Sequence, residues 1–165
     1  MSNIDLELLS LKRKLEYDSE SGEFRWLTTE FKHVAGNVAG RKSANGYIII
    51  YVNFKYYYAH KLAIWFETGA YPSFVDHANQ IPSDNRISNL RVCTQSQNCF
   101  NQGLKRSNTS GHKNVSYCKS WNKYTVQIKV NRVKHYIGGF DTLDEAVLAA
   151  DKARLEYAGE FARSS

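Results

Sequence analysis

An acid and a histidine stand side by side at Asp76-His77, and asparagines follow at Asn85, Asn89 and Asn98. Carboxylate and amide oxygens suit a hard cation such as Mg²⁺, and a neutral histidine can take a proton from water at neutral pH. Phosphodiester cleavage needs both functions, because water must lose a proton as it attacks phosphorus and charge develops on the leaving 3′-oxygen. These residues predict a metal-assisted phosphodiester hydrolase.

The distribution of charge predicts a polyanionic partner. Between Asn85 and Phe140 there is no Asp or Glu, whereas ten Lys and Arg residues occur there, and the formal net charge of the chain is +6. Nucleic acid and an anionic membrane surface are the two partners that such a charge favours. No apolar run approaches the roughly 20 residues of a transmembrane helix, and the N-terminus lacks a signal-peptide pattern. We therefore expect an intracellular protein with no membrane partner.

The three cysteines are an odd number and form no C-x-x-C pair. Cys93, Cys99 and Cys118 are therefore expected to be reduced thiols. A zinc site that combines two of them with His112 or His135 is the weaker alternative, and structural zinc is not expected.

The first half of the chain predicts short helices and strands. Residues 17–27 are typical of two strands joined by a Ser-Gly turn, and residues 46–58 alternate like a second strand pair. Residues 60–68 predict a helix that ends at Gly69. A short amphipathic helix is predicted at the N-terminus by apolar residues at helical spacing, namely Ile4, Leu8, Leu11 and Leu15.

The residues that could do chemistry need a strand, a loop and a helix to bring them together. Successive strand residues point to opposite sides, so Asp76 and His77 must lie at a strand end or a bend. A polar loop follows over residues 78–88, and Thr94 to Gln97 form a capping box that predicts a helix carrying Asn98. The order becomes ββα if the hairpin over residues 47–58, or a short strand before Asp76, pairs with the strand that ends there.

The C-terminal third predicts a sheet backed by one helix. Residues 103–111 have the composition of a linker, and residues 112–116, 123–130 and 133–140 are typical of three short strands. A capping box at Thr142 and Glu145 then opens a helix whose apolar residues share one face. The fold class expected for the whole chain is α+β.

Three separate runs of the chain resemble the HNH nuclease motif. They are residues 75–79, 83–91 and 94–98, and residues 45–62 resemble the segment that precedes this motif in phage and intron-encoded HNH homing endonucleases. The resemblance covers residues 15–105. It implies a ββα-metal fold and a metal-dependent endonuclease, a homing endonuclease, that hydrolyses double-stranded DNA.

The resemblance also implies roles for individual residues. His77 takes the place of the general base, and Asp76 and Asn98 take the places of the ligands of Mg²⁺, with Mn²⁺ as the alternative ion. Asn89 matches the middle asparagine of the catalytic motif, which braces the loop through backbone hydrogen bonds. Structural support is expected from His60 and Asn85, with His60 alternatively touching a phosphate. Candidate phosphate contacts are Lys61, Arg86 and Arg91.

One position departs from the family pattern. The family often has a glycine two residues after the equivalent of Ala78, where this chain has Gln80, followed by Ile81 and Pro82. Glycine at that position would permit a positive φ. The substitution leaves the conformation of this loop open, although it does not remove any of the expected ligands.

Residues 110–162 resemble the ethylene-response-factor type of DNA-binding domain, which is also found fused to phage HNH nucleases. The resemblance implies that the sheet enters the major groove while the helix packs behind it, a geometry that the groove admits. Several family arginines are Lys or Ser here, and Lys lacks the bidentate fork of Arg. The expected DNA-facing residues are Lys113, Ser116, Trp121, Lys123, Gln127, Lys129 and Lys134. The alternatives are a solvated sheet face for the lysines and core packing for Trp121 and Tyr124.

These expectations divide the chain into a nuclease domain over residues 1–106, with a ββα-metal core at about 58–103, and a DNA-binding domain over residues 107–165. The partner is double-stranded DNA, and a phage origin would place the protein in the bacterial cytoplasm. A monomer would nick, whereas a homodimer could cut both strands. Two other classes stay open: a DNA-binding transcription regulator with a catalytically degenerate nuclease motif, and an RNA-binding module.

Overall fold

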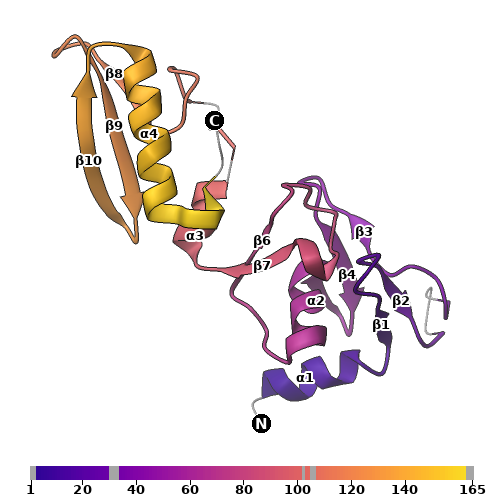
Figure 1. Ribbon diagram of the computed structural model, residues 1–165. Coiled ribbons are helices and arrows are strands. Elements are labelled where there is room, and N and C mark those ends of the chain that lie inside the picture. The colour runs from indigo at the N-terminus through magenta and orange to yellow at the C-terminus, as the bar shows by residue number, and fades with distance from the viewer. Residues whose placement is uncertain (1–2, 30–33, 102, 105–106, 163–165) are drawn as a thin grey trace. The chain divides into compact units, whose positions relative to one another are not determined.

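The computed structural model describes residues 3–29, 34–101, 103–104 and 107–162, and its mixture of helices and small sheets confirms the α+β class. The chain forms two compact units, Met1–Val92 and Cys93–Ser165 (Figure 1). The division falls before the helix that carries Asn98, because Phe100 of that helix shares a buried cluster with Ile128 and Ala153. The boundary expected at residues 106/107 between two functional modules stays a prediction.

The first unit begins with helix α1 (Asn3–Leu11), followed by a strand pair, β1 (Leu15–Tyr17) and β2 (Phe24–Trp26). The predicted helix is confirmed, and Leu8 and Leu11 are buried in the core. Leu15 does not continue the helix as expected. It lies in β1 opposite Trp26, and it reaches the same core from the strand.

A three-stranded antiparallel sheet and a helix complete the core of the first unit. The strands are β3 (Arg41–Lys42), β4 (Ile48–Val52) and β5 (Lys55–Tyr58), in that spatial order. Helix α2 (Ala59–Thr68) follows directly and buries Leu62 and Ala63. It ends as expected at Gly69, whose left-handed φ of 76° lets its N–H bond the carbonyl of Trp65.

The ββα order of the expected nuclease core is present. β6 (Phe74–His77) pairs with β7 (Leu90–Cys93), and α3 (Gln95–Asn101) follows. The 47–58 hairpin, one of the two pairing partners considered for this strand, does not pair with β6, because the intervening loop folds back through a short 3-10 turn (Ile87–Asn89) and delivers β7 instead. Thr94 and Gln97 exchange the two hydrogen bonds of the predicted capping box.

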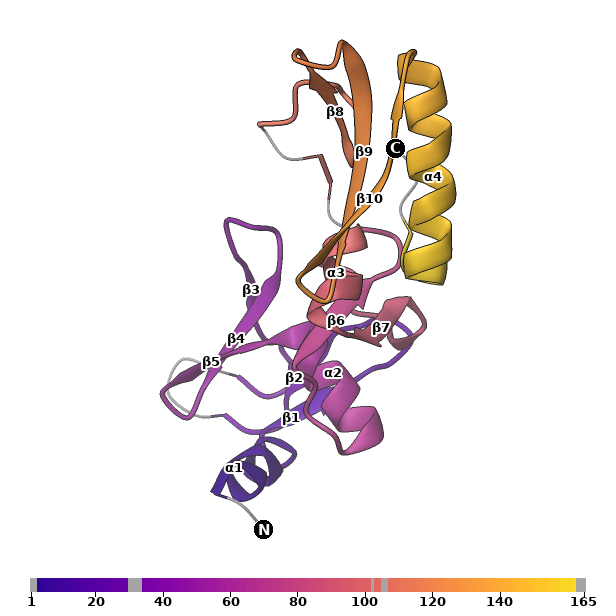
Figure 2. The same cartoon turned by 90° about the vertical axis from the view of Figure 1, so that its left-hand side faces the viewer.

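The second unit carries the predicted three-stranded antiparallel sheet, in the order β10-β9-β8. Its strands are β8 (Val115–Cys118), β9 (Lys123–Val130) and β10 (Val133–Phe140). β8 begins at Val115 rather than at residue 112, because Asn114 has a φ of 64° that interrupts an extended chain. Figure 2 shows the three strands as one layer with a single helix beside it.

That helix, α4 (Leu143–Ala158), confirms the predicted capping box at Thr142 and Glu145, and a 3-10 turn (Gly159–Phe161) follows it. Its small residues face the sheet, where Ala146 and Ala150 pack on Val126. Ala packs closely because it has no long side chain to hold it away from the strands. The opposite face of the sheet is therefore left uncovered by this helix.

The cysteines Cys93, Cys99 and Cys118 are free thiols. Among the described residues, no helix combines the length and the apolar character that a membrane crossing would need.

The turn between β1 and β2 lies against the loop that follows His77. Gly22 has a φ of +75°, and a Cβ added there would lie 2.5 Å from the carbonyl carbon of Asn85. Tyr17 donates its hydroxyl hydrogen to the Asn85 carbonyl (2.7 Å), and the Ser19 carbonyl accepts from the N–H of Ile87 (3.1 Å). The N-terminal hairpin therefore supports the loop through direct backbone contact.

We expect Gly22→Ala to lower the free energy of unfolding by roughly 2–4 kcal/mol, because it combines an unfavourable φ with a backbone collision. Gly36→Ala is the matched control. Gly36 also has a positive φ (+86°), but no atom of the residues that the structure describes lies within 4 Å of its added Cβ, so we expect the backbone cost of about 1–2 kcal/mol. Urea denaturation of both variants measures the difference. If both variants lost the same free energy of unfolding, the close contact between the hairpin and the loop would not contribute to stability.

Candidate active site

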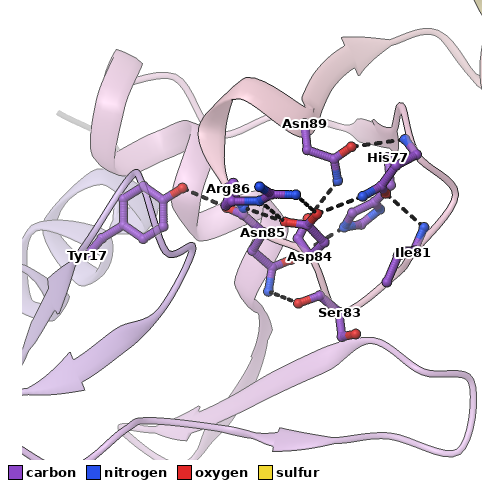
Figure 3. A network of polar contacts seen from close by, with 9 residues as sticks. Tyr17, His77, Ile81, Ser83, Asp84, Asn85, Arg86 and Asn89 are labelled. Atoms are coloured by element: carbon purple, nitrogen blue, oxygen red, sulfur yellow. Dashed lines mark hydrogen bonds and ion pairs between the residues drawn. The ribbon is translucent and has the colours of Figure 1, made fainter.

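His77 lies at the end of β6, is buried, and contacts Asn85. Its Nε2 lies 3.3 Å from Oδ1 of Asn85, whose own amide nitrogen donates to the Ser83 carbonyl at 3.5 Å (Figure 3). That second bond turns the amide oxygen of Asn85 toward the imidazole. The His77 Nε2 is therefore the donor, and this tautomer places the basic lone pair on Nδ1.

The surroundings of His77 favour a neutral imidazole. Burial lowers the pKa of His77 below its ordinary value, while the hydrogen bond to Asn85 and the charge of Asp76 act in the opposite direction. Because burial is the largest of these influences, His77 is uncharged at neutral pH. An uncharged imidazole has the lone pair that a general base requires.

The side chain of Asn89 joins the start of the loop to its middle. Its Oδ1 accepts from the N–H of Asn79 (2.9 Å), and its Nδ2 donates to the carbonyl of Asp84 (2.8 Å). Its own carbonyl accepts from the N–H of Ala78 (2.9 Å). These are backbone hydrogen bonds of the kind that the family resemblance implies for this position, and they fix the chain directly after His77.

Asp84 holds the middle of the loop together. Its carboxylate accepts from Nδ2 of Asn79 (2.6 Å) and from Nε of Arg86 (2.8 Å). The Arg86 hydrogen bond is the largest of the influences that hold the pKa of Asp84 well below its usual range. The carboxylate stays charged, so Asp84 acts here as an acceptor for loop donors.

Gln80 adopts the conformation that glycine favours at this position in the family. Its φ is 63°, and its N–H bonds the carbonyl of His77 at 2.9 Å. A non-glycine residue in this region costs about 1–2 kcal/mol, and the surrounding hydrogen bonds offset that cost. The missing glycine therefore leaves the turn itself in place.

Asp76, the expected metal ligand from β6, is buried beside Arg91, whose NH2 group lies 2.5 Å from Oδ2 of Asp76. A carboxylate of this kind fits a hard cation, and an amide oxygen from Asn98 would complete a donor set of the same character. Asn98 lies on α3, in the second unit. Within the described part of the chain, no group of three or more His, Cys, Asp or Glu side chains is arranged to hold a metal ion.

His60 packs against the candidate base. It is buried on α2, and its ring centroid lies 5.2 Å from that of His77 and 5.2 Å from that of Tyr47. Burial lowers the pKa of His60 to about 3, so the ring is neutral. Its Nδ1 makes no hydrogen bond within the described residues. The geometry suits the expected support of His77, because the two rings meet edge to face.

The three expected phosphate contacts in the first unit already have protein partners. Lys61 donates to the carbonyl of Ser73 (2.7 Å), and Arg86 and Arg91 pair with Asp84 and Asp76. The contact of these three side chains with phosphate therefore stays a prediction. To bind a phosphate, each cation would have to leave its protein partner or contact both groups at once.

In the second unit, strand register places most of the expected DNA-facing residues on one side of the sheet. Lys129 pairs with Lys134, Ser116 with Thr125, and Cys118 with Lys123. Paired residues point to the same side, so Gln127 shares this face. The face is opposite to Val126 and Ile128, which α4 covers. We call Ser116, Lys123, Gln127, Lys129 and Lys134 the open sheet face.

Two of the expected DNA-facing residues lie elsewhere. Trp121 lies between β8 and β9 and is 63% exposed, so it does not pack in the core. Tyr124, for which core packing was also considered, does pack against the buried cluster beneath α4. Lys113 extends toward α3 and donates to the Phe100 carbonyl (2.9 Å). Lys123 faces the expected side, but it pairs with Asp141 (3.1 Å).

Sequence reasoning missed two residues that extend this surface. Tyr136 lies opposite Gln127 on the open sheet face and is 55% exposed. Arg132 lies in the β9–β10 turn and lines a groove of about 820 Å³ with Lys113 and Lys129. Tyr136 lies two residues after Lys134 on β10, so the alternation of strand residues predicts that both face the same side. Arg132 was expected only to form the turn between the strands.

Comparison with known proteins identifies relatives of this chain. The family model described as HNH endonuclease matches residues 57–99. Protein 3.8 of Escherichia phage T7 is 30% identical over 90 residues, which cover 54% of this chain and 74% of that protein. An uncharacterized HNH endonuclease of Acanthamoeba polyphaga mimivirus is 33% identical over 96 residues, 57% of this chain and 49% of that protein. The search of solved structures found no match. The chain therefore belongs to the family of phage T7 protein 3.8 and is an HNH-type nuclease.

Proposed function

We propose that this chain is a metal-dependent endonuclease that hydrolyses phosphodiester bonds of double-stranded DNA. The observation that carries the proposal is the hydrogen bond between His77 Nε2 and Asn85 Oδ1, within a loop that Asn89 closes. It holds a neutral imidazole at the end of a strand, directly after a buried carboxylate. The match of residues 57–99 to the HNH endonuclease family supports the same conclusion.

The first role belongs to His77, whose Nδ1 accepts the proton of the attacking water. The imidazole is neutral for the reasons given above, and burial shields it from bulk water. His60 supports the ring from one side, and Asn85 sets its tautomer from the other. A base that is held in one tautomer and orientation loses little entropy when water and phosphate arrive.

The second role belongs to the oxygen ligands Asp76 and Asn98. They would hold Mg²⁺, or alternatively Mn²⁺, and the ion would neutralise charge on the leaving 3′-oxygen. The products are then a 5′-phosphate and a 3′-hydroxyl. Arg91 supplies the counter-charge of Asp76 in the structure, so an incoming cation would share this buried carboxylate with the guanidinium or replace it.

The third role, DNA binding, is assigned to the second unit. Lysines and a glutamine on the open sheet face can contact phosphates and base edges, and α4 covers the other side as an ethylene-response-factor-type domain requires. The acidic residues of the C-terminal third all lie from Asp141 onward, outside the sheet. We propose that the biological role of the nuclease is homing, in which it cuts a target site for a phage or another mobile element.

Cleavage of supercoiled plasmid tests the catalytic proposal. In the presence of Mg²⁺ we expect conversion to nicked or linear DNA, and we expect EDTA or the His77→Ala substitution to reduce the rate by at least about 100-fold. Lys152→Ala, on the exposed side of α4, serves as a surface control that should cut normally. The plasmid should carry the flanks of a phage homing site, because homing enzymes require their target. Full activity in His77→Ala would exclude His77 as the base.

Salt dependence of binding tests the assignment of the open sheet face. Neutralised phosphates release counterions, so the affinity for duplex DNA should fall steeply with salt. The double substitution Lys129→Ala and Lys134→Ala should reduce the slope of log K against log[salt] by about 2, measured by fluorescence anisotropy in EDTA. Replacement of Lys152, on the outer helix α4, should leave the slope unchanged. An unaltered slope in the double variant would place the DNA on another surface.

A further inference from the structure

The sheet of the first unit carries a row of tyrosines on its outer face. Tyr51 lies opposite Tyr56, and Ile49 lies opposite Tyr58. Alternate residues Ile50 and Val52 point the other way, into the core. The three tyrosines are 44%, 62% and 47% exposed in sequence order. We call Tyr51, Tyr56 and Tyr58 the tyrosine face.

Aromatic rings connect this face to the active site. Tyr51 and Tyr56 have ring centroids 4.7 Å apart, so they form one exposed pair across the two strands. Tyr58 stacks on His60 at 5.3 Å with an interplanar angle of 27°, and His60 contacts the ring of His77. A strand of DNA whose phosphate reaches His77 would therefore pass beside the tyrosine face.

The charge around the face fits a polyanion. Between residues 31 and 66 the sequence contains no Asp or Glu, and it contains five Lys and Arg residues. Arg41 lies opposite Ile49 and thus on the same side of the sheet as the tyrosines. Glu7 approaches the hairpin, but it pairs with Lys55 and Tyr57, which alternate to the other side of the sheet. Aromatic rings beside cations, without acids, are the usual composition of a surface that binds unpaired nucleotides.

We propose that the tyrosine face stacks unpaired bases of the DNA strand next to the scissile phosphate. Every base has a π-face, so stacking on tyrosine requires no particular sequence, whereas paired bases inside a duplex do not expose that face. The enzyme consequently prefers DNA that is opened beside the cut position. This inference rests on the proposed function, because the continuity with His77 is what places the strand there.

Binding in EDTA to two DNA duplexes of one length tests the proposal without requiring cleavage. One duplex is fully paired, and the other contains a bubble of six unpaired thymidines per strand. Any contribution of the open sheet face affects both duplexes equally, so the ratio of their dissociation constants isolates the unpaired bases. We expect the full-length protein to bind the bubble roughly tenfold more tightly, as measured by fluorescence anisotropy.

Two double variants of Tyr51 and Tyr56 distinguish base stacking on aromatic rings from contact with any exposed apolar side chain. Tyr51→Leu with Tyr56→Leu keeps apolar, strand-compatible side chains but removes the rings, so the preference for the bubble should fall to about one. Tyr51→Phe with Tyr56→Phe keeps the rings and should keep the preference. Thermal denaturation checks that both variants fold. A ratio of one in the wild type, or an unchanged ratio in the leucine variant, would overturn the proposal.

Two further results distinguish this proposal from the nuclease assignment. If the protein cuts plasmid but binds both duplexes equally well, it is a nuclease, but the tyrosine face does not bind unpaired bases. A protein that shows the preference, and loses it with the leucine substitutions, has the site even if no plasmid is cut. An equal preference for an RNA bubble would overturn the assignment of the face to DNA.

Discussion

The active site depends on how the loop between β6 and β7 satisfies its own backbone. Polar groups of the main chain must find partners wherever water is excluded. Asn89 meets this need at the start and in the middle of the loop with one side chain, which bonds the N–H of Asn79 and the carbonyl of Asp84. Because the chain directly after His77 is fixed in this way, Asn85 can bond the imidazole from the far side of the loop.

The remainder of the first unit supports this loop from outside. The hairpin of β1 and β2 presses Gly22 against the Asn85–Arg86 peptide, and Tyr17 bonds the Asn85 carbonyl. Helix α2 supplies His60 to the other side of the base. Segments far apart in the sequence thus restrain one imidazole, which is the kind of preorganisation that a catalytic base needs.

Much of this fold could be predicted from local signals, and the rest required tertiary contacts. Capping boxes at Thr94 and Thr142 and the left-handed Gly69 are determined within a few residues, so they marked helix ends reliably. Strand β7 was missed because residues 90–93 are short and follow an irregular loop. The contact of Gly22 with Asn85 joins residues too far apart in sequence for any pattern to connect them, and the ion pairs of Arg86 and Arg91 depend on such packing.

The tautomer of His77 tests most directly whether His77 is the general base, because the contacts of Asn85 and His60 hold this ring. Long-range ¹⁵N–¹H correlation spectra of the folded protein distinguish the two ring nitrogens, and His77→Gln assigns the signal. We predict a neutral ring protonated at Nε2, with Nδ1 unprotonated, and a midpoint of titration below the ordinary value of histidine. A ring protonated at Nδ1, or one that exchanges freely between tautomers, would contradict this prediction.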